Sequence, residues 1–158
     1  MIAGAVPAKE VAQMARIEES IEIKRPADKV FAYTTDARSW PKWQSMLPEA
    51  EQTSPGQVGV GTTFKGVVRL MGLSMKWTAK GTEYEPNKYW GKTIKSGSIL
   101  NKERLICDPI ATGTKFTIVY DMNVGSFMKL FSPMIVCSMR KETQKSLGNL
   151  KRLLEAQT

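Results

Sequence analysis

Residues 131–155 read FSPMIVCSMRKETQKSLGNLKRLLE, and this stretch decides the fold. One stripe of it recurs every three or four residues and consists of Phe131, Ile135, Met139, Thr143, Leu147, Leu150 and Leu154. That period predicts an amphipathic helix of about six turns, with one apolar face that packs on the rest of the chain.

The start of this helix has two interpretations. Ser132-Pro133 fits the N-cap and first residue of a helix, or a kink inside a helix that begins near Ser126. We expect the kink, because Phe127 and Met128 already stand at helical spacing from Phe131.

The stretch before the helix consists of short apolar-alternating segments separated by turn signals. The predicted strands span residues 50–53, 62–70, 74–84, 89–96, 99–108 and 114–124. The connections SPGQVGVG, MGL, EPNK, SGS and DPIATG are too short for crossover helices, so successive strands are expected to pair antiparallel.

The first part of the chain supplies one more strand and two short helices. IEESIEIK at 17–24 alternates isoleucine with glutamate, which predicts a half-buried strand. Pro26 is suited to open a helix through ADKVFAYTTDA, and Asp36 is a candidate N-cap for ARSWPKW. We expect residues 1–15 to form an arm, with a short helix in it as one option, and residues 16–158 to form a single domain.

The composition narrows the chemistry. The chain has 158 residues, which suits one domain, and it contains no histidine. Without histidine the usual general base and the commonest transition-metal ligand are missing. Cys107 and Cys137 cannot complete a zinc site alone, and we expect two reduced thiols rather than a disulfide. We therefore expect no metal, no cofactor and no catalytic residue.

The charge is a weak guide to partners. The formal net charge is +8, but the basic residues are spread along the chain, and Lys76 and Lys80 alternate with apolar neighbours as on a solvated strand face. We expect no nucleic-acid partner. The basic back of the C-terminal helix is expected to be solvated, with peripheral contact to an anionic membrane as the alternative. No secretory signal or spanning segment is recognisable, so a cytoplasmic location is expected.

Several short motifs accompany this order of elements. They are PADKVF at 26–31, DARSWPKW at 36–43, GVGT at 59–62, GTKF at 113–116 and LKRLLE at 150–155. Together they resemble the polyketide cyclase/dehydrase-like (SRPBCC) branch of the START-like superfamily. The resemblance implies an α+β helix-grip fold, in which a curved seven-stranded antiparallel sheet (order β-α-α-β6-α) wraps around the long C-terminal helix. It also implies a hydrophobic cavity between sheet and helix, which the residue patterns alone do not supply.

Strand parity predicts which side chains would line such a cavity. Lys65, Arg69, Lys76, Lys80 and Lys115 mark the outer face, so their neighbours point inward. The predicted ligand-binding residues are Phe64, Val68, Met75, Trp77, Trp90, Asn101, Glu103, Phe116, Ile118, Tyr120, Met122, Phe131, Ile135 and Met139. From the pattern alone, a core filled by these side chains is the alternative.

For two polar residues of that set the sequence leaves two alternative positions. Asn101 and Glu103 share a strand face with Leu105 and Cys107. If this face points inward, they would orient a ligand inside an apolar pocket. The alternative, which we expect, is that they lie near the rim and are solvated.

The resemblance and the apolar lining together favour binding of a hydrophobic small molecule, for transport or sequestration. The candidate ligands are a lipid, an isoprenoid, a quinone or a polyketide-like compound. An enzyme of the polyketide cyclase/dehydrase or hydrolase type, using a cavity carboxylate or tyrosine, is the alternative, and a protein-interaction module is the third. The missing histidine favours binding over catalysis.

Overall fold

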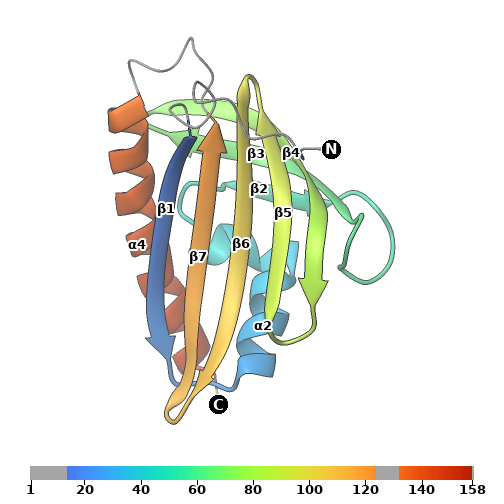
Figure 1. Cartoon of the computed structure of the whole chain (residues 1–158), viewed down its shortest axis with the longest axis vertical. Helices are drawn as coiled ribbons and strands as arrows, with labels where there is room; N and C mark the ends of the chain where they lie inside the picture. The colour runs from blue at the N-terminus through green and yellow to red at the C-terminus, as the bar shows by residue number, and fades with distance from the viewer. Residues whose placement is uncertain (1–13, 124–131, 158) are drawn as a thin grey trace, which may run out of the picture.

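The computed structural model describes residues 14–123 and 132–157. Seven strands form one antiparallel sheet in the order β1-β7-β6-β5-β4-β3-β2, and the sheet curves so that the long helix α4 lies alongside β1 (Figure 1). The strands are β1 (Met14–Ile23), β2 (Glu49–Gln52), β3 (Thr63–Leu70), β4 (Leu73–Glu85), β5 (Tyr89–Ser96), β6 (Ile99–Ile110) and β7 (Gly113–Asn123). The predicted helix-grip architecture is confirmed.

The sheet is a meander from β2 to β7, closed by the first strand. Each of β3 to β7 pairs with the strand before it, as their short connections predict. β1 then pairs with β7, where Met14 faces Asn123 and Ile23 faces Thr114. β1 therefore begins three residues before the strand predicted at 17–24, because β7 is long enough to pair with Met14, Ala15 and Arg16.

Two short helices and a 3-10 turn cross one side of the sheet. They are α2 (Ala27–Thr35), η1 (Ala37–Ser39) and α3 (Trp40–Trp43). The Asp36 side chain accepts a hydrogen bond from the Arg38 backbone N–H at 3.0 Å, so the predicted cap is confirmed. The Trp40 indole N–H donates to the Thr34 carbonyl at 2.8 Å, which fixes this tryptophan under the sheet.

Helix α4 (Ser132–Glu155) buries the predicted stripe. Its buried members are Ile135, Met139, Thr143, Leu147, Leu150 and Leu154. Thr143 is the polar member, and its hydroxyl donates to the Met139 carbonyl at 2.7 Å, so it is buried without an unpaired group. Phe131, the expected kink, the start near Ser126 and residues 1–13 of the expected arm lie outside the described residues.

The core contains a tight aromatic cluster. The ring centroids of Trp40 and Phe64 are 5.0 Å apart, those of Phe64 and Trp90 are 5.5 Å apart, and those of Trp40 and Trp90 are 5.7 Å apart. Trp43 packs edge-on against Phe116 at 6.2 Å. At this level the space between the sheet and the helices is filled by side chains, as the filled-core alternative describes.

Candidate ligand-binding cavity

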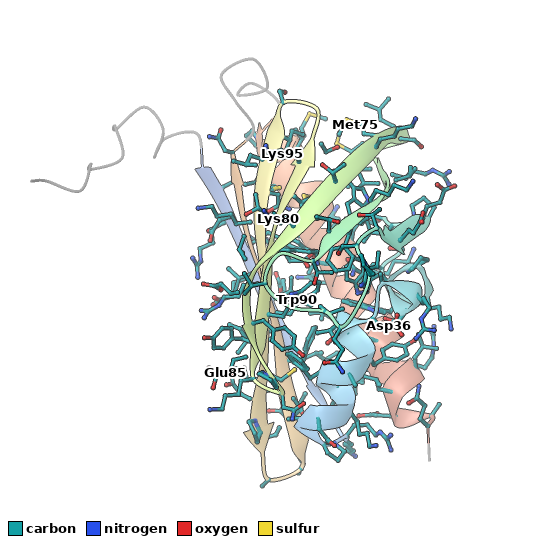
Figure 2. All side chains as sticks on the ribbon, turned by 90° about the vertical axis from the view of Figure 1, so that its right-hand side faces the viewer. Asp36, Met75, Lys80, Glu85, Trp90 and Lys95 are labelled. Carbon is teal, nitrogen blue, oxygen red and sulfur yellow. The ribbon has the colours of Figure 1, made fainter. Side chains whose placement is uncertain are left out.

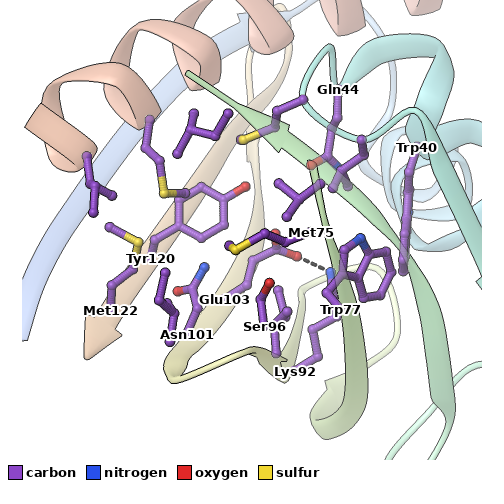
Figure 3. A pocket seen from close by; sticks show the side chains of 18 residues that line it. Trp40, Gln44, Met75, Trp77, Lys92, Ser96, Asn101, Glu103, Tyr120 and Met122 are labelled. Carbon is purple, nitrogen blue, oxygen red and sulfur yellow. Dashed lines mark hydrogen bonds and ion pairs between the residues drawn. The ribbon is translucent and has the colours of Figure 1, made fainter. Parts of the chain in front are cut away.

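A cavity lies beyond the aromatic cluster, where the sheet and α4 leave space between them. It has a volume of about 100 Å³, and Figure 3 shows the 18 side chains around it. The strands β3 to β7 supply most of its wall, and Ile135 and Met139 of α4 face them. Figure 2 shows two labelled residues along the sheet, with Trp90 at mid-height and Met75, which lines the cavity, towards one end.

The wall is almost entirely apolar and contains several flexible side chains. Its methionines are Met46, Met75, Met122 and Met139. Small-molecule pockets usually measure about 300–1,000 Å³, whereas an apolar cavity of about 150 Å³ holds benzene. At about 100 Å³ the cavity is somewhat smaller than the one that holds benzene, so its size comes nearest to that of a single small ring. Because methionine is unbranched and adapts its shape easily, the wall can be rearranged around a larger molecule.

The inward-facing residues predicted from strand parity divide between the cavity and the core. Those at the cavity wall are Val68, Met75, Trp77, Asn101, Glu103, Tyr120, Met122, Ile135 and Met139. Phe64, Trp90, Phe116 and Ile118 face the same way but lie in the packed core, away from the cavity wall. A role of any of them in binding stays a prediction.

The expectation that Asn101 and Glu103 are solvated at a rim is wrong. Both side chains are buried, because the inner face of β6 is covered by α4 and by the opposite side of the curved sheet. Glu103 forms an ion pair with Lys92, which faces it across β5 and β6. Each of these two side chains is only 4% exposed. Such a pair is stable inside a protein only when both partners are present.

Lys92 is held from three sides. Its ammonium group pairs with Glu103, lies 4.3 Å from the ring centroid of Trp40 and lies 4.5 Å from that of Trp90. Cation–π contacts of this kind are stronger away from water. Lys92 therefore joins the aromatic cluster on one side to the cavity wall on the other.

Tyr120 continues the same row of side chains. It faces Glu103 across β6 and β7, and it is buried. Burial raises the pKa of Tyr120 well above its ordinary value, and the nearby Glu103 carboxylate raises it further, both by its charge and by accepting a hydrogen bond from the phenol. The phenol therefore stays protonated at neutral pH and acts as a donor to Glu103.

Asn101 has a different environment from Glu103. Its cross-strand neighbours are Ile94 on β5 and Met122 on β7, neither of which can donate a hydrogen bond. The Oδ1 atom of Asn101 is buried and has no hydrogen-bond partner among the described residues. The cavity wall therefore carries a polar acceptor that no residue in 14–123 or 132–157 uses.

Sequence reasoning missed the side of the cavity that lies outside the long strands. Trp40, Gln44, Met46 and Leu47 come from α3 and the turn after it. Tryptophans at positions 40 and 43 around Pro41 were the available signal, since large aromatic side chains on a short helix need a buried surface. Lys92 was missed because a charged side chain on the same strand face as Trp90 and Ile94 left it unclear which face of β5 points inward.

The thiols and the carboxylates offer no metal site in the described part of the chain. Cys107 is buried and Cys137 is exposed, and both are free. Burial raises the pKa of Cys107 to about 12, with the charge of Asp108 as a smaller cause, so this thiol is unreactive at neutral pH. Within residues 14–123 and 132–157 no three histidine, cysteine, aspartate or glutamate side chains are grouped to hold an ion.

No helix in these ranges is long and apolar enough to cross a bilayer.

A family model confirms the class of protein that the fold defines. Residues 14–155 match the family described as polyketide cyclase / dehydrase and lipid transport. The match spans nearly the whole chain, and the protein belongs to this family. No curated protein matches the sequence.

Solved structures confirm the fold at low sequence identity. The Zhui aromatase/cyclase from Streptomyces sp. R1128 superposes with a TM-score of 0.76 at 14% identity, covering 90% of this chain and 94% of that one. The di-domain aromatase/cyclase BexL gives 0.76 at 13% identity, covering 93% of this chain and 52% of that one. Ara h 8.0201 gives 0.69 at 16% identity, covering 90% and 99%.

Proposed function

We propose that the protein binds a hydrophobic small molecule in this cavity, for transport or sequestration. The observation that carries the proposal is the apolar, methionine-rich wall between the sheet and α4. Burial of apolar ligand surface there would supply roughly 25 cal/mol per Å² before the costs of association. Lipids, isoprenoids, quinones and polyketide-like compounds are the candidate classes, and family membership supports them.

The size of the cavity sets a condition on the ligand. A molecule of one ring requires only a small expansion of the volume of about 100 Å³. A lipid or quinone requires the methionines to move, and Met75 is the member best placed to do so because its side chain is partly exposed. Met71 and Leu73, at the tip of the same β3–β4 hairpin, are exposed apolar side chains next to this end of the wall.

The test uses toluene as a probe of suitable size and two neighbouring positions on α4. Ile135 lines the cavity, whereas the side chain of Met134 is 56% exposed and is not part of the wall. We expect Ile135→Trp to fill the cavity and to weaken toluene binding at least tenfold in titration calorimetry. Met134→Trp is the matched control and should bind as the unchanged protein does. Equal binding by both variants would contradict the proposal.

A second candidate function is an enzyme of the cyclase/dehydrase or hydrolase type. The buried row of Lys92, Glu103 and Tyr120 favours it, because a carboxylate and a protonated phenol at a dry apolar wall are suited to move a proton. Glu103 would remove a proton from carbon next to a carbonyl group, and the same proton would return to a departing hydroxide to release water.

Dehydration of a small β-hydroxyketone tests this candidate, since the conjugated enone that forms absorbs in the ultraviolet. We expect the protein to accelerate the reaction over buffer, and Glu103→Gln to reduce the acceleration by about a hundredfold or more. Toluene binding by the same variant controls for folding. No acceleration by the unchanged protein would leave binding as the function and contradict catalysis of this reaction.

A further inference from the structure

Asn101 carries a buried acceptor atom in the cavity wall that no described residue uses. The side chain is 9% exposed, it belongs to the cavity wall, and its Oδ1 has no hydrogen-bond partner among the described residues. Figure 3 shows the amide at the cavity beside Tyr120 and Glu103. A buried acceptor without a donor destabilises a protein, and each such atom in a folded protein requires an explanation.

The polar side chains nearby are already committed to other groups. Lys92 and Tyr120 both direct their protons to Glu103. The Ser96 hydroxyl, also in the wall, donates to the Lys76 carbonyl at 3.2 Å. No described residue donates to Asn101 Oδ1, which leaves this acceptor available to a molecule in the cavity.

An unpaired indole N–H gives no comparable information. Trp77 lines the cavity and its N–H is unpaired, but the N–H groups of Trp43 and Trp90 are unpaired as well. Trp43 and Trp90 lie away from the wall, so this feature is not specific to the site. The acceptor on Asn101 is the distinguishing one.

The charges of the wall set a second condition. Among the described residues of the wall, Lys92 is the cation and Glu103 the anion, and they neutralise each other. A ligand carboxylate or phosphate would be buried with no cation of its own, which is costly. The wall thus fits an uncharged molecule.

We propose that Asn101 makes the cavity selective for uncharged molecules of about one ring that carry a hydroxyl or N–H donor. The donor binds Asn101 Oδ1, and the ring occupies the apolar space beside the methionines. This rests on the proposed function, because the cavity must bind a small molecule for the selectivity to act.

A comparison of phenol with toluene isolates the effect of the hydrogen-bond donor. The two molecules have the same ring and differ only in a hydroxyl or a methyl group of similar size. The measured quantity is the ratio of their dissociation constants, from calorimetry on the unchanged protein and on Asn101→Leu. We expect the variant to lose about three- to tenfold of the preference for phenol over toluene, the range of one neutral hydrogen bond. Ser146→Ala is the matched control, because its hydroxyl is also buried and unpaired among the described residues but lies outside the cavity wall, and its ratio should change less than about twofold. Benzoate should bind more than about a hundredfold more weakly than phenol.

The outcomes distinguish this inference from the proposed function. Toluene binding to Asn101→Leu shows that the variant is folded. If toluene binds but the ratio is the same in all three proteins, the role of Asn101 is overturned while the proposed function stands. Benzoate binding as tight as that of phenol overturns the preference for uncharged molecules. If neither toluene nor phenol binds the unchanged protein, the proposed function itself is contradicted.

Discussion

The inner faces of β6 and β7 divide into two halves, because they are packed at one end and line the cavity at the other. On the inner face of β6, Leu105 and Cys107 lie in the packed core, whereas Asn101 and Glu103 belong to the cavity wall. β7 repeats the division, with Phe116 and Ile118 in the core and Tyr120 and Met122 at the cavity. The facing helices explain the difference, because Trp40 and Trp43 fill the space at one level and shorter, flexible side chains leave it open at the next.

The ion pair of Lys92 and Glu103 lies at the boundary of the two halves, and breaking it should have the largest effect. Glu103→Leu leaves Lys92 buried without a counter-ion, and we expect the free energy of unfolding to fall by about 3–5 kcal/mol in urea denaturation. Replacing both partners, as Lys92→Met with Glu103→Leu, should restore most of the loss.

An exposed ion pair between β4 and β6, the two strands that flank β5, provides the control. Arg104 and Glu83 lie 3.0 Å apart with both side chains nearly half exposed, and Glu83→Gln should cost less than about 1 kcal/mol. If Glu103→Leu is as mild as Glu83→Gln, the buried pair does not join the two halves in the way described.

The same substitution in each half should give opposite results. Ile118 lies in the packed core and Ile135 at the cavity. Ile118→Phe overfills a dense region and should lower the free energy of unfolding by about 1–3 kcal/mol. Ile135→Phe extends into free space and should leave it unchanged or raise it. Thermal or urea unfolding of the two variants measures the contrast, and equal losses would mean that the two halves are packed alike.

The smallest effect concerns pH in the packed half. The Cys107 thiol has an ordinary pKa of 9.0, which burial raises to about 12 in the folded protein. Between these values the unfolded chain releases a proton that the folded protein keeps, so the free energy of unfolding should fall as pH rises above 9. The slope is at most about 1.4 kcal/mol per pH unit.

Urea denaturation between pH 8.5 and 9.5 measures this fall, where Tyr120, with an ordinary pKa of 10.0, adds a smaller slope that Cys107→Ala keeps. Cys107→Ala should flatten the dependence, and Cys137→Ala, which removes an exposed thiol, should keep it. If Cys107→Ala kept the original slope of the free energy of unfolding against pH, the Cys107 thiol would not be the cause of the pH dependence.

The sequence predicts the fold well because each element has its own local signal. The alternation in residues 17–24, the turn residues between strands and the stripe of α4 each specify one element, and the family motifs add the arrangement. Strand parity also separates the inner from the outer face, since the side-chain period is fixed. The division of the inner face into core and cavity depends on where Trp40 packs, which is a long-range contact without a local pattern.

The polar part of the wall shows the same limit. Lys92 and Glu103 are eleven residues apart in the sequence and become cross-strand neighbours only when β5 and β6 pair. Neither strand alone indicates that its charge is buried. From the sequence, Glu103 is expected near a solvated rim because burial of a single carboxylate is usually costly. The partner that removes this cost lies on another strand, so sequence reasoning residue by residue could not supply it.

A crystal structure of the protein soaked with toluene tests the central claim most directly. The account predicts electron density for one ring between Met75, Tyr120 and Met139, with the Lys92–Glu103 pair intact. Density confined to the outer surface, with methionine side chains filling the cavity, would contradict it.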